Sequence, residues 1–144
     1  MTVSQILNSK GRNVVTTSSD QTMLTVARIL AEKRIGAVVI VDATGNIEGI
    51  ASERDFVRAI AQRGTGALDR PVRELMTRTV KTCTPSDTEA ELMVLMTENR
   101  IRHVPVMQDG RLAGMISIGD VVKFRMEAIE REAEEMKTYI ASAG

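Results

Sequence analysis

The chain repeats itself, and this internal repeat limits what it can fold into. Residues of the first half recur 66 positions later in the second half. From the turn at Gly45 onward, the distance between matching residues is 65. The slip of one residue lies in the turn around Gly45, where a change of length disturbs no core position. Two copies of one structural unit are therefore predicted. The repeated residues are Val14, Thr16, Thr22, Glu32, Arg34, Ile35, Val38, Gly45, Gly49, Ser52 and Asp55, which return as Val80, Thr82, Thr88, Glu98, Arg100, Ile101, Val104, Gly110, Gly114, Ser117 and Asp120.

Each copy has the pattern of a β-α-β-β-α unit. Apolar residues at helical spacing follow Thr22 and Thr88, which stand where helix N-caps are expected. Glu91 lies three residues after Thr88 and predicts a capping box. Two apolar segments around a glycine-bearing turn predict a β-hairpin, and a closing helix begins near Arg54 or Gly119. The predicted strands are 14–16, 37–41 and 47–52 in the first copy, and 80–82, 103–107 and 112–117 in the second.

The fold class expected from this pattern is α+β, with two such repeats packed around a pseudo-twofold axis. A small sheet with helices on one face leaves its other face apolar, and a second copy can cover that face. Short helical stretches at 3–7 and 72–76 precede the units, and residues 62–71 have the composition of a linker. We predict a first repeat over 1–66, a second over 67–124 and a C-terminal helical extension over 125–144.

Composition excludes several classes of protein. Among 144 residues the net charge is +0 and aromatic residues make up 2%, which argues against a nucleic-acid partner. No apolar run is long enough to span a membrane, and no signal peptide is apparent. The single cysteine, Cys83, excludes an internal disulfide and is typical of a reducing cytoplasm. His103 is the one histidine, so no multi-histidine metal site is expected.

The segments Gly49-Ile-Ala-Ser52-Glu-Arg-Asp55 and Gly114-Met-Ile-Ser117-Ile-Gly-Asp120 resemble the closing motif of cystathionine β-synthase (CBS) domains. Met76-Thr77 and the segment from Arg100 to Val106 are similar to other recurrent pieces of that family. The chain therefore resembles a stand-alone tandem CBS pair. The resemblance implies a non-catalytic sensor of adenosine ligands such as AMP, ATP, NAD or S-adenosylmethionine, with no obligatory cofactor. It also implies a separate regulated protein and a homodimer.

Ser52 with Asp55 and Ser117 with Asp120 suit such a ligand. A carboxylate accepts charge-assisted hydrogen bonds from both ribose hydroxyls. Each pair also stands at the expected start of a helix, where free N–H groups favour a phosphate. The alternative is that these side chains only cap their helices. Glu53 and Asp55 are expected to be solvated, so we predict no catalytic residue there.

The resemblance also implies walls for the adenine. It places Val14, Thr16, Ile35, Gly36, Ala37 and Ile50 in one site with Asp55, and Arg54 beside the phosphate. It places Thr77, Val80, Thr82, Ile101, Arg102, His103, Pro105 and Met115 in a second site with Asp120. Because Arg100, Arg102 and His103 lie in the second copy, the site of Asp120 is expected to bind more tightly.

The C-terminal segment predicts a long helix with an apolar stripe of coiled-coil spacing. The stripe favours self-association, with packing against its own domain as the alternative. A structural adaptor with vestigial clefts is the second function that the sequence leaves open. The stripe consists of Val122, Met126, Ile129, Ala133, Met136 and Ile140.

Overall fold

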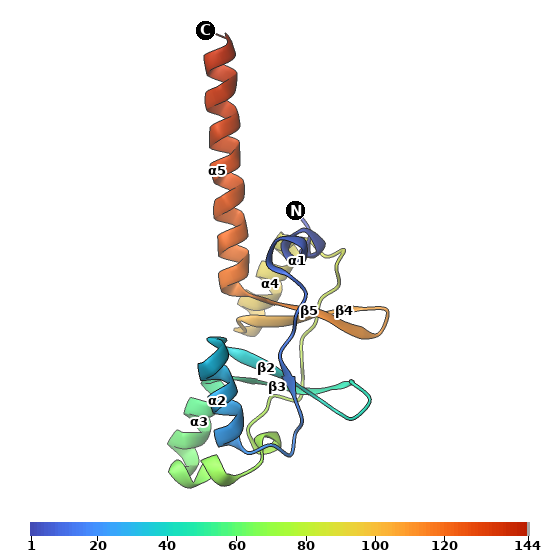
Figure 1. The fold of residues 1–144 in the computed structure, drawn as a ribbon, viewed down its shortest axis with the longest axis vertical. Helices are drawn as coiled ribbons and strands as arrows, with labels where there is room; N and C mark the ends of the chain where they lie inside the picture. The colour runs from blue at the N-terminus through green and yellow to red at the C-terminus, as the bar shows by residue number, and fades with distance from the viewer. Residues whose placement is uncertain (144) are drawn as a thin grey trace.

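A computed structural model describes residues 1–143 and has the mixed α+β architecture expected from the repeat (Figure 1). The first unit has the order β-α-β-β-α and the second the order α-β-β-α, and each is preceded by a short helical segment. The elements are α1 (Val3–Lys10), β1 (Thr16–Thr17), α2 (Met23–Lys33), β2 (Ala37–Val41), β3 (Ile47–Ser52), α3 (Glu53–Arg63), the 3-10 helices η1 (Thr65–Asp69) and η2 (Val72–Glu74), α4 (Glu89–Asn99), β4 (His103–Gln108), β5 (Arg111–Ser117) and α5 (Ile118–Ala143).

The two sheets differ by one strand. The first sheet has the order β1-β2-β3, with β1 parallel to β2 and β2 antiparallel to β3. The second has only β4 and β5 within the described chain, so the strand predicted at 80–82 is wrong. In the first sheet the Val39 N–H donates to the carbonyl of Val15. Pro105 stands at the position of Val39 in the second copy and has no N–H to donate, so only Cys83 bridges to β4.

The helix starts agree closely with local sequence signals. The Thr22 and Thr88 hydroxyls accept hydrogen bonds from the amides of Thr25 and Glu91, both at 3.1 Å. The predicted capping box of α4 is wrong, because within residues 88–91 the Glu91 side chain makes no return bond to Thr88. The predicted linker is folded rather than open: η1 lies in it and buries Ala67 against the first repeat.

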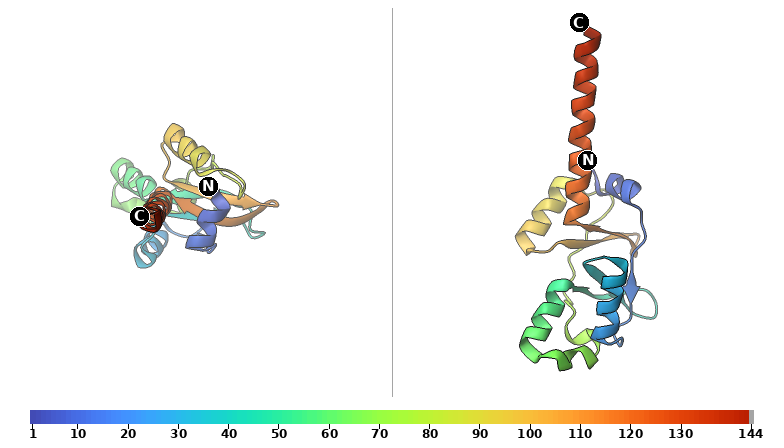
Figure 2. Two further views of the ribbon diagram at one scale, coloured as in Figure 1. Left: turned by 90° about the horizontal axis from the view of Figure 1, so that it is seen from above. Right: turned by 60° about the vertical axis from the view of Figure 1, so that its left-hand side comes forward.

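Each repeat has its own core, and each core takes a segment from the other half of the chain. Helix α1 buries Val3, Ile6 and Leu7 among side chains of the second repeat. Reciprocally, Val72 and Met76 are buried in the core of the first repeat. Figures 1 and 2 show α1 lying beside the second repeat, although it precedes β1 of the first. The two halves of the chain are thus interlocked.

The recurrent glycines Gly49 and Gly114 allow this exchange. A Cβ on Gly114 would lie 2.7 Å from Leu7, and a Cβ on Gly49 would lie 2.8 Å from Met76. At such distances the neighbouring side chain must shift, so a side chain at either glycine would disturb the packing of the exchanged segment. The glycines of the repeated motif are therefore explained by close packing.

Helix α5 extends far beyond the second repeat (Figures 1 and 2). Its apolar stripe is exposed, with Met126 at 56% and Ile140 at 63% of their full accessible surface. The alternative in which the stripe packs against its own domain is therefore wrong. Among residues 1–143, no helix combines the length and apolar character needed to cross a membrane.

Candidate functional site

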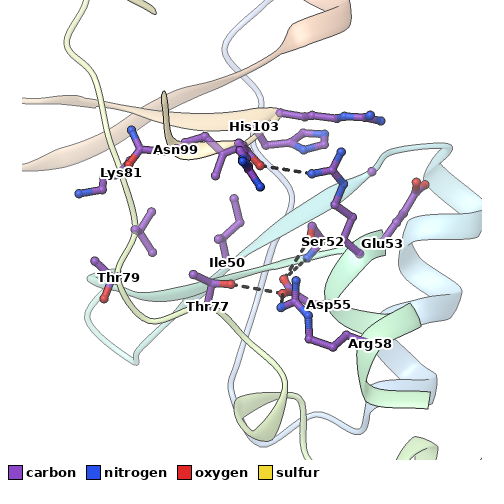
Figure 3. A pocket seen from close by; sticks show the side chains of 16 residues that line it. Ile50, Ser52, Glu53, Asp55, Arg58, Thr77, Thr79, Lys81, Asn99 and His103 are labelled. Carbon is purple, nitrogen blue, oxygen red and sulfur yellow. Dashed lines mark hydrogen bonds and ion pairs between the residues drawn. The ribbon is translucent and has the colours of Figure 1, made fainter. Parts of the chain in front are cut away.

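A pocket of about 450 Å³ lies between the two repeats (Figure 3). The end of β3 and the start of α3 form one side. The segment 77–81 and the turn between α4 and β4 form the other. Its lining residues are Gly36, Ile50, Ser52, Glu53, Arg54, Asp55, Arg58, Thr77, Thr79, Val80, Lys81, Asn99, Arg100, Ile101, Arg102 and His103.

Asp55 is the most deeply buried charged group of the pocket, with 6% of its surface exposed. Its Oδ2 accepts hydrogen bonds from the Ser52 amide at 2.9 Å and from the Ser52 hydroxyl at 3.1 Å. Its Oδ1 accepts one from the Thr77 hydroxyl at 3.3 Å, and Arg58 lies at 3.5 Å (Figure 3). Asp55 therefore caps α3 and also faces the pocket, so the capping role and a ligand role are compatible in geometry.

The pocket carries more positive than negative charge. Five cationic side chains line the pocket against the two carboxylates Glu53 and Asp55. Arg54 reaches across the gap, where its Nη1 donates to the Arg100 carbonyl at 3.2 Å. The pocket thus attracts anions, and the guanidinium groups match phosphate geometry. The five are Arg54, Arg58, Lys81, Arg100 and Arg102.

His103 lies at the boundary between the repeats. A Cβ on Gly36 would lie 2.9 Å from its imidazole ring, so a side chain at residue 36 would require the ring to move. Burial lowers the pKa of His103 below its usual value, against the attraction of Glu53 and Asp120. The imidazole is therefore neutral near pH 7 and acts in the pocket as a polar wall, not as a cation.

Asp120, the counterpart of Asp55, has a different environment. The Lys10 ammonium lies 2.6 Å from Asp120 Oδ2 and also donates to the Met115 carbonyl at 2.6 Å. Burial by itself would raise the pKa of Asp120. The bonds from Lys10 and from the Ser117 amide outweigh burial, and the pKa lies below its usual value. A lysine from the exchanged helix α1 therefore holds the carboxylate that was expected to meet a ribose.

The structure brings together only part of the predicted site residues. Ten of them line the pocket: Gly36, Ile50, Ser52, Arg54, Asp55, Thr77, Val80, Ile101, Arg102 and His103. The other nine do not line it: Val14, Thr16, Ile35, Ala37, Thr82, Pro105, Met115, Ser117 and Asp120. Ala37 and Pro105 are buried within their strands.

The predicted grouping of these residues was wrong. The sequence separated Ile50 and Asp55 from Thr77 and the segment 101–103, but all of these share one pocket. The exchange of segments explains the error, because the Thr77 carbonyl accepts the Ile50 N–H at 3.0 Å and the Ile50 carbonyl accepts the Thr77 N–H at 2.9 Å. The prediction of tighter ligand binding at Asp120 depended on this grouping, so its premise is wrong as well. Arg100, Arg102 and His103 line the pocket of Asp55 instead.

Sequence reasoning missed several lining residues, including Arg58, Thr79, Lys81 and Asn99. One of them carried a usable signal: Arg58 stands three residues after Asp55, so both lie on the same face of α3. Thr79 and Lys81 lie in an irregular segment, where no periodicity indicates which side chains face a partner.

Comparison with known proteins agrees with the repeat. The family model of the CBS domain matches the chain twice, over residues 3–62 and 72–127. The chain belongs to the CBS-domain family. Both matches begin within the short segment that precedes each unit, so each CBS domain includes the piece whose side chains pack in the other core.

Solved CBS-domain structures share this fold. A CBS-domain-containing protein from Agrobacterium tumefaciens is 48% identical, with a TM-score of 0.85 over 86% of this chain and 92% of that one. The CBS domain pair of protein MJ0100, in complex with 5′-methylthioadenosine and S-adenosyl-L-methionine, is 26% identical, with a TM-score of 0.79 over 89% and 98%. A CBS domain protein from Pyrobaculum aerophilum, complexed with AMP, is 31% identical, with a TM-score of 0.74 over 83% and 89%.

Proposed function

We propose that the pocket around Asp55 binds an adenosine nucleotide and that the chain is a non-catalytic sensor or regulatory module. The observation that carries the proposal is a buried carboxylate at the start of α3, in a pocket that five cationic side chains also line. Similar CBS-domain proteins complexed with AMP or with S-adenosylmethionine support an adenosine ligand.

The proposed contacts follow from the chemistry of each group. Asp55 Oδ2 already accepts two bonds from Ser52, whereas Oδ1 accepts one from Thr77 and keeps a lone pair that can accept from a ribose hydroxyl. The arginines and the amides at the start of α3 receive the phosphate. Ile50, Val80 and Ile101 offer an apolar surface to the adenine.

Charge selects among adenosine ligands. Five cations against two carboxylates favour AMP, ATP or NAD, whose phosphates are anionic, over S-adenosylmethionine with its sulfonium cation. The volume of about 450 Å³ lies within the ordinary range for small-molecule sites. We therefore take AMP as the first ligand to test.

AMP is expected to raise the melting temperature. At 100 times its dissociation constant a ligand adds about 2.7 kcal/mol to the free energy of unfolding, which corresponds to roughly 5–10 °C for a chain of this size. Differential scanning fluorimetry with AMP, ATP and NAD measures this shift, with GMP as the control that changes only the base. Absence of a shift with every adenosine ligand would exclude the proposal and favour a structural adaptor.

The site of Asp120 is proposed to be closed by Lys10. Lys10→Met keeps the length and apolar stem of the side chain but removes the ammonium that holds Asp120. We expect the number of AMP molecules bound per chain to rise from one to two, as measured by isothermal titration calorimetry.

Lys33→Met is the matched control, because Lys33 is exposed at the end of α2 and contacts neither carboxylate. It should keep a stoichiometry of one. A stoichiometry of two in the unmodified chain would show that Lys10 does not close the second site.

The proposal includes a homodimer and a separate regulated protein, supported by the exposed apolar stripe of α5. It also includes a reducing compartment such as the cytoplasm. Cys83 is buried and free, and burial raises its pKa to about 12, so it stays an unreactive thiol.

A further inference from the structure

Helix α5 has one face against its domain and another face without a partner. Val121 is 2% exposed, and the Arg125 Nε lies 2.9 Å from Oε1 of the buried Glu89 on α4. Beyond residue 128 every residue through 143 is exposed. The helix is therefore anchored at its first turns and free of its own domain along the rest of its length.

The free part carries the apolar stripe. The stripe begins one residue after Val121, which turns it by about 100° from the buried face. Its side chains follow the alternating spacing of three and four that places a and d positions along one seam. Exposures of 58% at Ile129 and 60% at Met136 leave much apolar surface in water. An exposed seam of this kind is stabilised by a second helix with the same spacing.

The charges beside the stripe select the orientation of that helix. With Met126 and Ala133 at a positions, Glu132 falls at g and Lys137 at e. In a parallel pair in register, Glu132 lies beside the partner's Lys137, and the reverse pair repeats this contact. Within residues 1–143, the contact of either side chain is limited to a loose ion pair at 3.6 Å between Lys137 and Glu134, both about three-quarters exposed. Arg125 is paired with Glu89 of its own chain and is therefore not counted among the charges available to a second helix.

An antiparallel pair brings like charges together. With the apolar layers matched, Lys123 would face the partner's Lys137. Glu130 would face Glu130 of the second copy, and Glu132 would face its Glu132. Like charges at such positions destabilise a coiled coil, whereas the parallel arrangement has only opposite charges there.

We propose that α5 pairs with α5 of a second copy of this chain in a parallel, in-register coiled coil. The proposal deepens the homodimer proposed above and is independent of nucleotide binding. It requires no other part of the surface, since the seam and its flanking charges lie in the exposed portion of α5.

A disulfide crosslink tests the orientation. Ala133→Cys places a thiol at the seam, where two copies meet only in a parallel, in-register pair. Arg131→Cys is the control, because residue 131 lies on the outer face of the helix. After mild oxidation of the full-length protein with diamide, we expect most of the Ala133→Cys protein to run as a crosslinked dimer. The Arg131→Cys control and the unmodified protein should remain uncrosslinked, since Cys83 is buried.

A charge exchange tests the flanking contact. Glu132→Lys alone and Lys137→Glu alone should each weaken the dimer on the order of tenfold by sedimentation equilibrium, because each creates two like-charge contacts. The double exchange should restore the original affinity. These positions contact no core residue, so the variants are expected to fold.

Equal crosslinking at 131 and 133, a monomer at all concentrations, or a double exchange that does not rescue would each overturn the proposal. Crosslinking is measured without nucleotide and again with AMP. A failure of AMP to bind therefore leaves this test intact, and a failure to crosslink leaves the nucleotide proposal intact.

Discussion

Asp55→Asn is expected to weaken AMP binding by roughly 10- to 150-fold, whereas Asp120→Asn leaves the affinity unchanged. Loss of a charge-assisted hydrogen bond costs about 1.5–3 kcal/mol, which gives this range. Asp55 lies in the open pocket among five cations, while Asp120 is held by Lys10. Isothermal titration calorimetry of the two variants and the parent measures the difference.

Asparagine is chosen because its carbonyl can still accept from the Ser52 amide and keep α3 capped. The melting temperature of each unliganded variant is the control for folding. If Asp55→Asn binds AMP like the parent at unchanged stability, Asp55 is a helix cap only. If Asp120→Asn is the damaging change, the assignment of the two sites is reversed.

Leu7→Ala is expected to destabilise the chain by about 2–5 kcal/mol, although Leu7 precedes the first predicted strand. Leu7 is 0% exposed and packs over Gly114 in the core of the second repeat, so its truncation leaves a cavity there. Urea unfolding monitored by circular dichroism measures the loss. The loss should appear as a lower midpoint with an unchanged slope.

Val57→Ala is the matched control, because it shortens a side chain that is 69% exposed on α3. Its midpoint should stay close to that of the parent. An equally small effect of Leu7→Ala would mean that α1 is not part of the second core in solution.

Local signals in the sequence were sufficient to predict the helices and hairpins of each repeat. The hairpins at 37–52 and 103–117, the caps at Thr22 and Thr88, and the long final helix follow from residues close together in the chain. Their periodicity and capping chemistry act over one or two turns, so a single sequence contains them. The repeat then predicted that there are two such units.

The third strand of the second sheet was the exception among these elements. Residues 80–82 look like 14–16, but a strand also needs a partner whose N–H groups are free. Pro105 on β4 cannot supply one, and the pairing is reduced to Cys83. Pro105, the residue that prevents this pairing, lies about 25 positions away along the chain. The register of the sheet alone makes it a neighbour of residues 80–82.

Which residues form the site depends on tertiary contacts that no local sequence pattern indicates. The sequence determined the repeat, the α+β units, the doubled serine–aspartate motifs and the apolar seam of α5. Only the tertiary structure decided that the segments before each unit exchange cores. That exchange brings Thr77 to Asp55 and Lys10 to Asp120. A lysine reaches its partner through a flexible stem, across more than one hundred residues of sequence. Two motifs that look equivalent in the chain thus differ in the fold, one aspartate lining a pocket and the other held in an ion pair, because their neighbours come from opposite halves of the fold.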